Sequence, residues 1–352
     1  MMPSAKEILL SGTIIYGDDF EPVDGYLCIK DDLIREVGVG RVDADFEGII
    51  APRFINSHTH IGDSVFKDPP FMPLADLVGP GGLKHRILAQ TPKETIIDGM
   101  RRTLAYMIAT GTIAFADFRE GGQEGVELML DALQGMPILP RIFGRPYEGS
   151  AEIHSSCWGL GVSSTRDYDP EKIQRIVKAV KAGFKAVAIH AGEAESDDIS
   201  DALRLEPDFL VHLCSATNES LERIAALGVP AVVCPRSNLI TGARLPNVKK
   251  MTELGITVGV GTDNAMLNSP NMFSEMELVC KALLHDDRQV FKMCTLNGAK
   301  ILGIDQKVGS ISEGKEGRVM VIDSKSDNIW GSADPLASLV RRAEPSDIIA
   351  VF

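Results

Sequence analysis

The chain has 352 residues, of which 44% are hydrophobic and 6% aromatic, and its formal net charge is −13. This composition is typical of a folded globular protein and excludes a disordered or fibrous chain. The negative charge weighs against nucleic acids and anionic membranes as partners, because both are polyanions. We therefore expect a small-molecule partner, no nucleic acid and no membrane, and leave open whether the chain forms a homo-oligomer.

The six cysteines are widely spaced, form no C-x-x-C pair, and mostly lie in apolar surroundings such as "AVVCP". This pattern is typical of reduced core residues in a cytoplasmic protein. The first residues lack the basic start and long apolar run of a signal peptide, and no stretch reaches the roughly 18 apolar residues of a membrane span. The sequence therefore predicts a cytoplasmic location.

Both ends of the chain read as short strands joined by Gly and Asp turns, over residues 1–48 and again over 303–352. Neither end could bury a core alone. We therefore predict that they pair into one small composite β-sandwich domain.

Residues 49–302 alternate short apolar runs with helical patterns, which is typical of strand and helix units around a parallel sheet. In "TPKETIIDGMRRTLAYMIATG", Thr91 is the predicted N-cap, and Glu94 closes a capping box with it. Similar helix patterns cover residues 169–183 and 217–228.

The apolar runs between these helices read as buried strands, and there are eight of them: "IIAPRFINSH", "TIAFADF", "PILPRIFG", "LGVSS", "KAVAIHAG", "DFLVHLC", "VPAVVCP" and "TVGVGTD". Eight strands with helices between them favour a closed (β/α)8 barrel of the TIM type over an open doubly wound sheet. In such barrels the chemistry lies at the carboxyl ends of the strands, because the loops there converge. Polar residues at those ends are the candidates for function.

The first run ends in His58 and His60, separated by one threonine. Residues two apart on an extended segment point to the same side, as two ligands of one ion must. A pair of this kind also arises by chance among seven histidines, so alone it is weak evidence for a metal site.

Other runs end in polar residues of the same kind: His190 with Glu193, His212, and Asp263. Each histidine alone has a simpler interpretation, as a core or loop residue paired with a backbone carbonyl. A barrel would bring all these strand ends to one mouth, however, which favours one shared site.

The motifs "FINSHTH", "HAGE", "VHLCSA", "CPRSN", "GVGTDNA" and "TLNGAKILGI", in this order, closely resemble the amidohydrolase superfamily. The likeness is greatest to the branch that holds cytosine deaminase, guanine deaminase, nucleoside-type deaminases and triazine chlorohydrolases. It covers nearly the whole chain. It implies a TIM-type barrel with a composite β-domain built from the two ends.

The resemblance further implies that His58, His60, His190 and Asp263 bind one divalent metal ion, Zn²⁺ or Fe²⁺, with a water in the open position. Imidazole and carboxylate ligands suit these metals, which lower the pKa of bound water. Binuclear members use a carboxylated lysine at the end of the fourth strand. Here that region reads "GLGVSSTRD", without lysine, so we expect one metal.

In the catalytic scheme that the resemblance implies, Asp263 accepts a proton from the water and His212 contacts the hydroxide or the developing oxyanion. Glu193 protonates a ring nitrogen and passes the proton to the leaving ammonia. The alternative interpretation of Glu193 is an acidic loop residue exposed to solvent. The predicted function is a mononuclear metal-dependent aminohydrolase that deaminates a small nitrogen heterocycle resembling a nucleobase, pterin or triazine.

Two alternatives stay open at this point. One is a hydrolase that cleaves a C–N or C–Cl bond of a heterocycle from the same site, and the other is a catalytically silent metal-binding barrel.

The candidate substrate contacts are Arg119, Arg145 and Asn264, which follow predicted strands; salt-bridged surface arginines are the alternative for the first two. In "CPRSN", Ser237 and Asn238 are better suited to structural hydrogen bonds.

Overall fold

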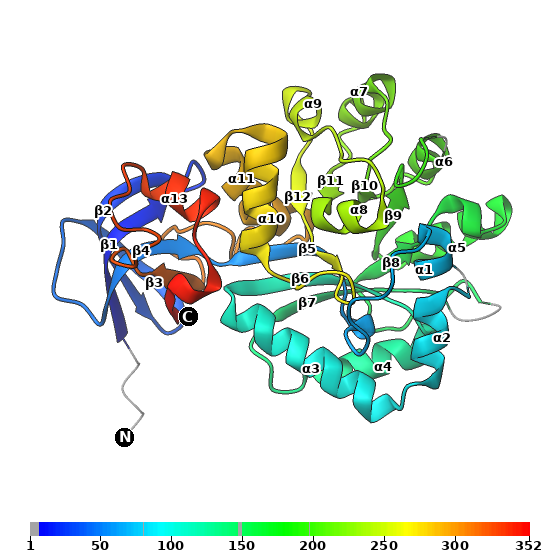
Figure 1. The fold of residues 1–352 in the computed structure, drawn as a ribbon, viewed down its shortest axis with the longest axis horizontal. Helices are drawn as coiled ribbons and strands as arrows, with labels where there is room; N and C mark the ends of the chain where they lie inside the picture. Colours follow the sequence, from blue (N-terminus) through cyan, green and yellow to red (C-terminus); the bar gives the residue numbers. More distant parts are fainter. Residues whose placement is uncertain (1–6, 80, 147–149, 197) are drawn as a thin grey trace. The chain divides into compact units, whose positions relative to one another are not determined.

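The computed structural model describes residues 7–79, 81–146, 150–196 and 198–352 (Figure 1). Contacts divide the chain into two compact units. The terminal unit comprises the described residues up to Ile55, Ala109–Ile113 and Met272–Phe352, and the central unit comprises Asn56–Ile108 and Ala114–Asn271.

The terminal unit contains a six-stranded sheet in the order β15-β14-β4-β1-β2-β3. Its strands are β1 (Glu7–Tyr16), β2 (Glu21–Lys30), β3 (Leu33–Val39), β4 (Phe46–Pro52), β14 (Val319–Ile322) and β15 (Ile348–Val351). Strands from the two ends of the chain therefore share one sheet, as expected, while the sandwich itself stays a prediction.

The β1–β4 pair of this sheet is parallel and unusually close at Gly12, which faces Gly48. A Cβ at Gly12 would lie 2.0 Å from the Gly48 carbonyl oxygen, so no larger residue fits there. Around this pair, Leu10, Ile14 and Leu27 belong to one buried apolar cluster. The helices of this unit are α10 (Met272–Leu278), α11 (Asp287–Cys294), α12 (Leu296–Ile301) and α13 (Pro335–Arg341), with a π-helix at Val279–Leu284.

The second sheet has nine strands in the order β12-β11-β10-β9-β8-β7-β6-β5-β13. They are β5 (Phe54–His60), β6 (Thr112–Arg119), β7 (Leu139–Gly144), β8 (Gly159–Val162), β9 (Ala186–Ala191), β10 (Phe209–His212), β11 (Ala231–Val233), β12 (Val258–Val260) and β13 (Asp263–Asn264). Each of the eight predicted runs contains a strand. Pairs from β6 to β12 are parallel, as a strand–helix pattern predicts.

The two edges of this sheet belong to one segment of chain. β12 pairs with β11, whereas β13, three residues later, pairs with β5. Between them Thr262 bonds to the side chain of Asn56, whose Nδ2 donates to the Thr262 hydroxyl over 2.8 Å and whose Oδ1 accepts from the Thr262 N–H over 3.1 Å. The result is a curled sheet, consistent with a TIM-like barrel.

The helices of the central unit lie beside the strands and over their ends (Figure 1). They are α1 (Leu74–Val78), α2 (Leu83–Gln90), α3 (Lys93–Ala109), α4 (Gly122–Leu133), α5 (Pro170–Ala182), α6 (Ile199–Arg204), α7 (Asn218–Ala226), α8 (Pro235–Thr241) and α9 (Val248–Glu253). The predicted starts of α5 and α7 are confirmed, because the side chains of Asp169 and Thr217 accept hydrogen bonds from the first turns.

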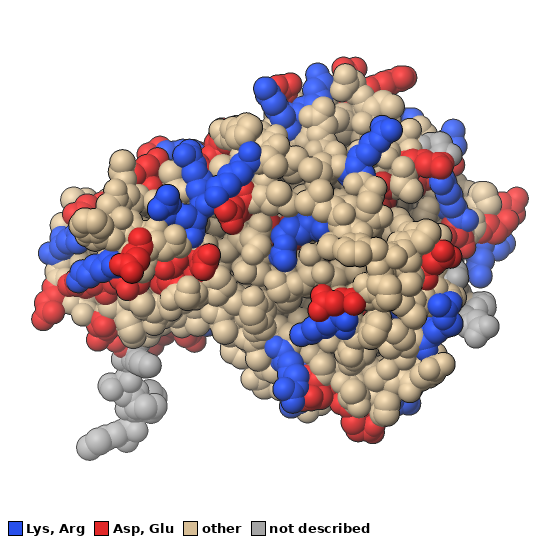
Figure 2. Space-filling view, viewed as in Figure 1, with Lys and Arg blue, Asp and Glu red and all other residues tan. Residues whose placement is uncertain are grey.

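Acidic and basic side chains are interspersed over the face of the molecule shown in Figure 2, without a broad patch of one sign. Within the described residues, no helix combines the length and apolar character needed to cross a membrane.

Candidate functional site

A cavity of about 820 Å³ lies at the carboxyl ends of strands of the nine-stranded sheet. This is the place where parallel strands and their loops are expected to gather functional groups. Much of its polar lining comes from the ends of β5, β6, β9, β10 and β13, and much of its apolar lining comes from helices α1 to α4. The apolar residues are Leu74, Ala75, Val78, Leu88, Ala89, Ile96, Met100 and Leu128.

His58 and His60 on β5 and Asp263 on β13 form one compact group of buried ligand atoms, all within 4.8 Å of one another. Nε2 of His58 lies 3.2 Å, and Nε2 of His60 3.6 Å, from Oδ1 of Asp263. The pairing of β13 with β5 sets Asp263 opposite Thr59, between the two histidines. The side chains of residues 58 and 60 thus share one side, as the spacing predicts.

Asp263 has a φ of 60°, a left-handed backbone conformation that is costly for a residue with a Cβ. Its neighbours hold it there. The Ser237 hydroxyl donates to Oδ2 over 2.5 Å, and the following residue, Asn264, donates from Nδ2 to Asp63 over 2.6 Å. Strain of this kind persists only where the surroundings fix it, and it is frequent at functional sites.

Two further groups of the same compactness share members with the first: His58, His190 and His212, and Glu193, His212 and Asp263. The structure thus brings together all six residues that the sequence predicted for the metal site and its chemistry. They come from four strands, β5, β9, β10 and β13, and from the loop that follows β9.

Hydrogen-bond partners indicate which ring nitrogen of His190 and of His212 carries the proton. Nδ1 of His190 lies 2.7 Å from the Val162 carbonyl oxygen, which only accepts, so Nε2 keeps its lone pair. Nδ1 of His212 accepts from the amide nitrogen of Asn238 over 3.2 Å in this amide orientation, which puts the proton on Nε2. His190 can therefore bind a cation through Nε2, whereas His212 can donate a hydrogen bond from Nε2.

The charges of the site match a set of metal ligands. Burial lowers the pKa of His58 to about 3, so its imidazole is neutral. Burial acts to raise the pKa of Asp263, but Nε2 of His58, 3.2 Å from its Oδ1, and the nearby rings of His212 and His60 lower it well below its usual value. Neutral imidazole and ionised carboxylate are the forms that bind a metal.

Neither ring nitrogen of His58 has a hydrogen-bond partner, although the ring is fully buried. Buried polar atoms without partners are rare and need an explanation. A divalent cation beside Nε2 would supply one, and the set of imidazoles with one carboxylate suits such an ion. The residues present therefore fit a divalent metal.

Glu193 lies near the same ligands, with Oε2 3.6 Å from Nε2 of His212. Burial raises the pKa of this carboxyl group, and the charge of His212 opposes that rise only in part. A raised pKa increases the protonated fraction near neutral pH, as a general acid requires.

The three residues predicted to contact substrate all line the cavity. Arg119 is 4% exposed and pairs with Asp117 over 3.3 Å and with Glu120 over 2.7 Å. Arg145 donates to the Gly161 carbonyl. Substrate contact by these three residues stays a prediction.

Sequence reasoning missed Glu120 and Lys84, which both line the cavity and form an ion pair of 2.6 Å. Glu120 directly follows the strand that ends in Arg119, so the strand-end rule could have found it. Lys84 lies on α2 and carried no such signal. His85, next to Lys84 on α2, also lines the cavity.

The sequence pattern of the Amidohydrolase family matches residues 49–352. Among curated relatives, the uncharacterized protein MJ0699 of Methanocaldococcus jannaschii is 32% identical over 372 residues, covering 97% of each chain. A 5-methylthioadenosine/S-adenosylhomocysteine deaminase of Moorella thermoacetica is 25% identical over 380 residues, covering 93% of this chain and 88% of its own.

Solved structures share the fold at low sequence identity. An adenosine deaminase from Xanthomonas campestris with bound zinc has a TM-score of 0.76 at 16% identity, covering 98% of this chain and 91% of its own. The atrazine chlorohydrolase of Arthrobacter aurescens with zinc has a TM-score of 0.81 at 17% identity, and the match covers 98% of this chain and 95% of its own. A guanine deaminase from C. acetobutylicum with bound guanine has a TM-score of 0.78 at 17% identity, and the match covers 99% of this chain and 98% of its own.

Proposed function

Because the chain belongs to the amidohydrolase family, we propose that it is a mononuclear metal-dependent aminohydrolase. It deaminates a small nitrogen heterocycle that resembles a nucleobase, pterin or triazine, and releases ammonia. One observation carries this proposal: three histidines, an aspartate and a glutamate of raised pKa meet in one cavity.

The proposed ligands are His58, His60, His190 and Asp263, holding one Zn²⁺, with Fe²⁺ as the second choice. When bound, the ion lowers the pKa of a water toward neutrality. Zinc in the similar structures supports this choice. A single ion is proposed because residues 159–167, at the end of β8, contain no lysine.

In the proposed reaction Asp263 accepts a proton of the attacking water on one carboxylate oxygen. The Ser237 hydroxyl donates a hydrogen bond to the other oxygen, Oδ2. His212 carries its proton on Nε2, since Asn238 occupies Nδ1, and donates to the negative charge that develops on the substrate. Both side chains are almost fully buried, so these interactions work in a medium that strengthens them.

Glu193 acts as the general acid. Its protonated form gives a proton to a ring nitrogen, which makes the neighbouring carbon electrophilic. The water oxygen bonds to that carbon after Asp263 has taken its first proton. The ionised Glu193 then takes the second proton from the same oxygen and passes it to the amino group, so that the exocyclic C–N bond breaks and ammonia leaves. The proton held by Asp263 restores Glu193. An amide hydrolase can rely on polarisation of its carbonyl by the metal, which is why Glu193 favours deamination over that alternative.

Arg145, Asn264 and Arg119 are the proposed substrate contacts. Arg119 is already engaged by two carboxylates, so Arg145 is the stronger candidate. The cavity of about 820 Å³ lies near the upper end of the range for small-molecule sites, about 300–1,000 Å³. It leaves room for a substituent on the ring, and the names of relatives make purine nucleosides worth testing.

We also propose that residues 49–302 form a closed (β/α)8 barrel, with 1–48 and 303–352 as a composite β-sandwich domain. The shared segment at the two edges of the nine-stranded sheet supports the closed barrel. The six-stranded sheet built from both ends of the chain supports the composite domain.

The test is a panel of aminated and chlorinated nucleobases, pterins, triazines and purine nucleosides, assayed for release of ammonia and chloride. Glu193→Gln should lower the deamination rate by about 10²–10⁴-fold with metal content unchanged. Glu195→Gln is the matched control, because this exposed glutamate of the same loop pairs with Arg166.

Full activity in Glu193→Gln would remove the proton-transfer role. Chloride release or ring opening without ammonia would favour the other hydrolase. Absence of turnover on the whole panel together with absence of bound transition metal would favour the silent barrel.

A further inference from the structure

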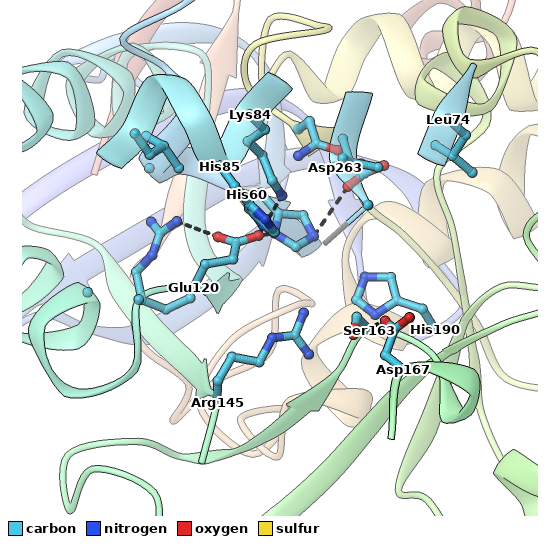
Figure 3. Close-up of a pocket in the computed structure, with 18 of the residues that line it drawn as sticks. His60, Leu74, Lys84, His85, Glu120, Arg145, Ser163, Asp167, His190 and Asp263 are labelled. Carbon is cyan, nitrogen blue, oxygen red and sulfur yellow. Dashed lines mark hydrogen bonds and ion pairs between the residues drawn. The ribbon is translucent and has the colours of Figure 1, made fainter. Parts of the chain in front are cut away.

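Glu120 is a nearly buried carboxylate at the end of β6 with no role in the scheme above. Its Oε1 lies 2.8 Å from Nδ1 of His60 and 2.6 Å from Nζ of Lys84. Its Oε2 accepts from Arg119 over 2.7 Å. Figure 3 shows the ring of His60 between Glu120 and Asp263, with Lys84 beside the Glu120 carboxylate.

The close contact of His60 with Glu120 determines which ring nitrogen carries the hydrogen, although its angle is not that of a hydrogen bond. A carboxylate oxygen has only lone pairs to offer, and at 2.8 Å a second lone pair on Nδ1 would repel it. Nδ1 therefore carries the hydrogen. Nε2 keeps its lone pair, and it is the nitrogen that faces Oδ1 of Asp263 at 3.6 Å.

The carboxylate of Glu120 is itself held in place. Lys84, on α2, and Arg119, on β6, are 5% and 4% exposed, and they contact different oxygens of Glu120. Arg119 is fixed in turn by Asp117 on the same strand. A carboxylate with both oxygens engaged by buried cations has little freedom to rotate, and neither has the ring that it contacts.

We propose that Glu120 is a positioning residue for His60: it fixes the Nδ1–H tautomer and the ring orientation, so that Nε2 is presented to the metal. The inference rests on the proposed function, because it takes His60 as a metal ligand. Outer carboxylates of this kind typically change metal affinity by about 10–100-fold when they are removed.

His190 provides an internal comparison. Its Nδ1 is held by the backbone carbonyl of Val162 at 2.7 Å, a partner that no substitution at position 162 removes. His60 depends instead on a side chain, so its orienting group can be deleted while the ligand stays in place.

The test uses the full chain, stripped of metal, and measures the Zn²⁺ dissociation constant by competition with a chelator. Glu120→Ala should weaken Zn²⁺ binding by about 10–100-fold. The control is Glu127→Ala, an exposed glutamate on α4 that contacts only Gln123 among the hydrogen bonds described for it; it should bind as wild type does. The visible spectrum of bound Co²⁺ reports the ligand geometry and should change in Glu120→Ala and not in the control.

Glu120→Ala leaves the buried Lys84 without its ion pair and Arg119 with Asp117 alone, and can fail to fold. The double variant Glu120→Gln with Lys84→Met removes one charge of each sign and has similar side-chain volumes, so the net charge of the buried cluster and its packing are preserved. It should unfold near the wild-type temperature and still bind Zn²⁺ at least about tenfold more weakly.

Separate outcomes distinguish the two levels of inference. If His60→Ala loses the metal while both Glu120 variants bind Zn²⁺ within about twofold of wild type, with the same Co²⁺ spectrum, the role of Glu120 is overturned and the proposed function stands. If wild type binds no divalent metal, or His60→Ala binds it as tightly as wild type, the ligand assignment fails, and the role of Glu120 with it.

Discussion

Two adjacent residues of α8, Ser237 and Asn238, each contact a different residue of the site. The Ser237 hydroxyl donates to Oδ2 of Asp263, and the Asn238 amide contacts Nδ1 of His212. Both are fully buried, so their orientation depends on the start of this one helix. Asp263, the proposed proton acceptor, and His212, proposed to stabilise the developing charge, are thus positioned by two consecutive residues of the chain.

Removing the hydroxyl of Ser237 should therefore slow catalysis. A hydrogen bond to a charged group contributes about 1.5–3 kcal/mol, so Ser237→Ala should lower kcat by about 10–100-fold, with the fold intact. Thr252→Ala is the control, because that hydroxyl bonds only helix carbonyls on α9. Steady-state kinetics with metal analysis decide it; a wild-type kcat in Ser237→Ala would show that Asp263 needs no such support.

At the level of single residues, the ends of apolar runs were sufficient to predict which side chains converge. His58, His190 and Asp263 meet because parallel strands end on one side of a sheet, a rule that needs no coordinates. Lys84 could not be found this way, because it reaches the site from a helix, and a lysine in "GGLKHRI" looks like any solvated lysine. Its burial follows from the position of α2 over Glu120, which is set by tertiary packing.

Among the elements, the first apolar run shows why strand boundaries escape sequence reasoning. Residues 49–58 read as one strand, but β4 ends at Pro52 and β5 begins at Phe54, in a different sheet. Residues 49–58 are all buried, so hydropathy does not change where one sheet passes to the next. The break is at Arg53, whose guanidinium donates to the carbonyls of Thr112 and Phe352.

The run at residues 257–263 is likewise broken, between β12 and β13, and the side chain of Asn56 replaces the missing ladder bonds. Asn56→Ala would leave the buried N–H and hydroxyl of Thr262 without these partners, at a cost of about 1–3 kcal/mol for each group. We expect a lower urea midpoint with an unchanged m-value. Because Asp263 follows Thr262, bound metal should also be lost more readily.

The double variant Asn56→Ala with Thr262→Val tests this assignment by a mutant cycle. Removing the hydroxyl together with its partner should cost less than the sum of the two single changes. Strict additivity would mean that the Asn56 side chain stabilises the sheet edge in some other way than by these bonds.

At the scale of the whole molecule, two electrostatic effects oppose each other as the pH falls. The net charge of −13 at pH 7 means that uptake of protons relieves repulsion across the surface, where acidic and basic groups are already mixed (Figure 2). Buried histidines such as His58 have the opposite effect, because they bind protons more weakly in the folded protein than in the unfolded chain, so acid lowers the free energy of unfolding. Surface repulsion is screened over about 8–10 Å at physiological salt, whereas buried groups are screened much less.

The stability of the metal-free protein should therefore decrease from pH 6.5 toward pH 4 at 0.15 M salt. The pKa of His58 is about 3 in the folded protein against about 6.5 in an unfolded chain. Its stabilising effect is thus complete above pH 6.5 and is lost as the pH falls toward 3, at about 1.4 kcal/mol per pH unit. Urea unfolding at several pH values measures this slope, which should be smaller in His58→Asn and unchanged in the control His285→Gln, where the histidine is exposed on the surface. Rising stability on acidification would mean that surface charge outweighs the buried site.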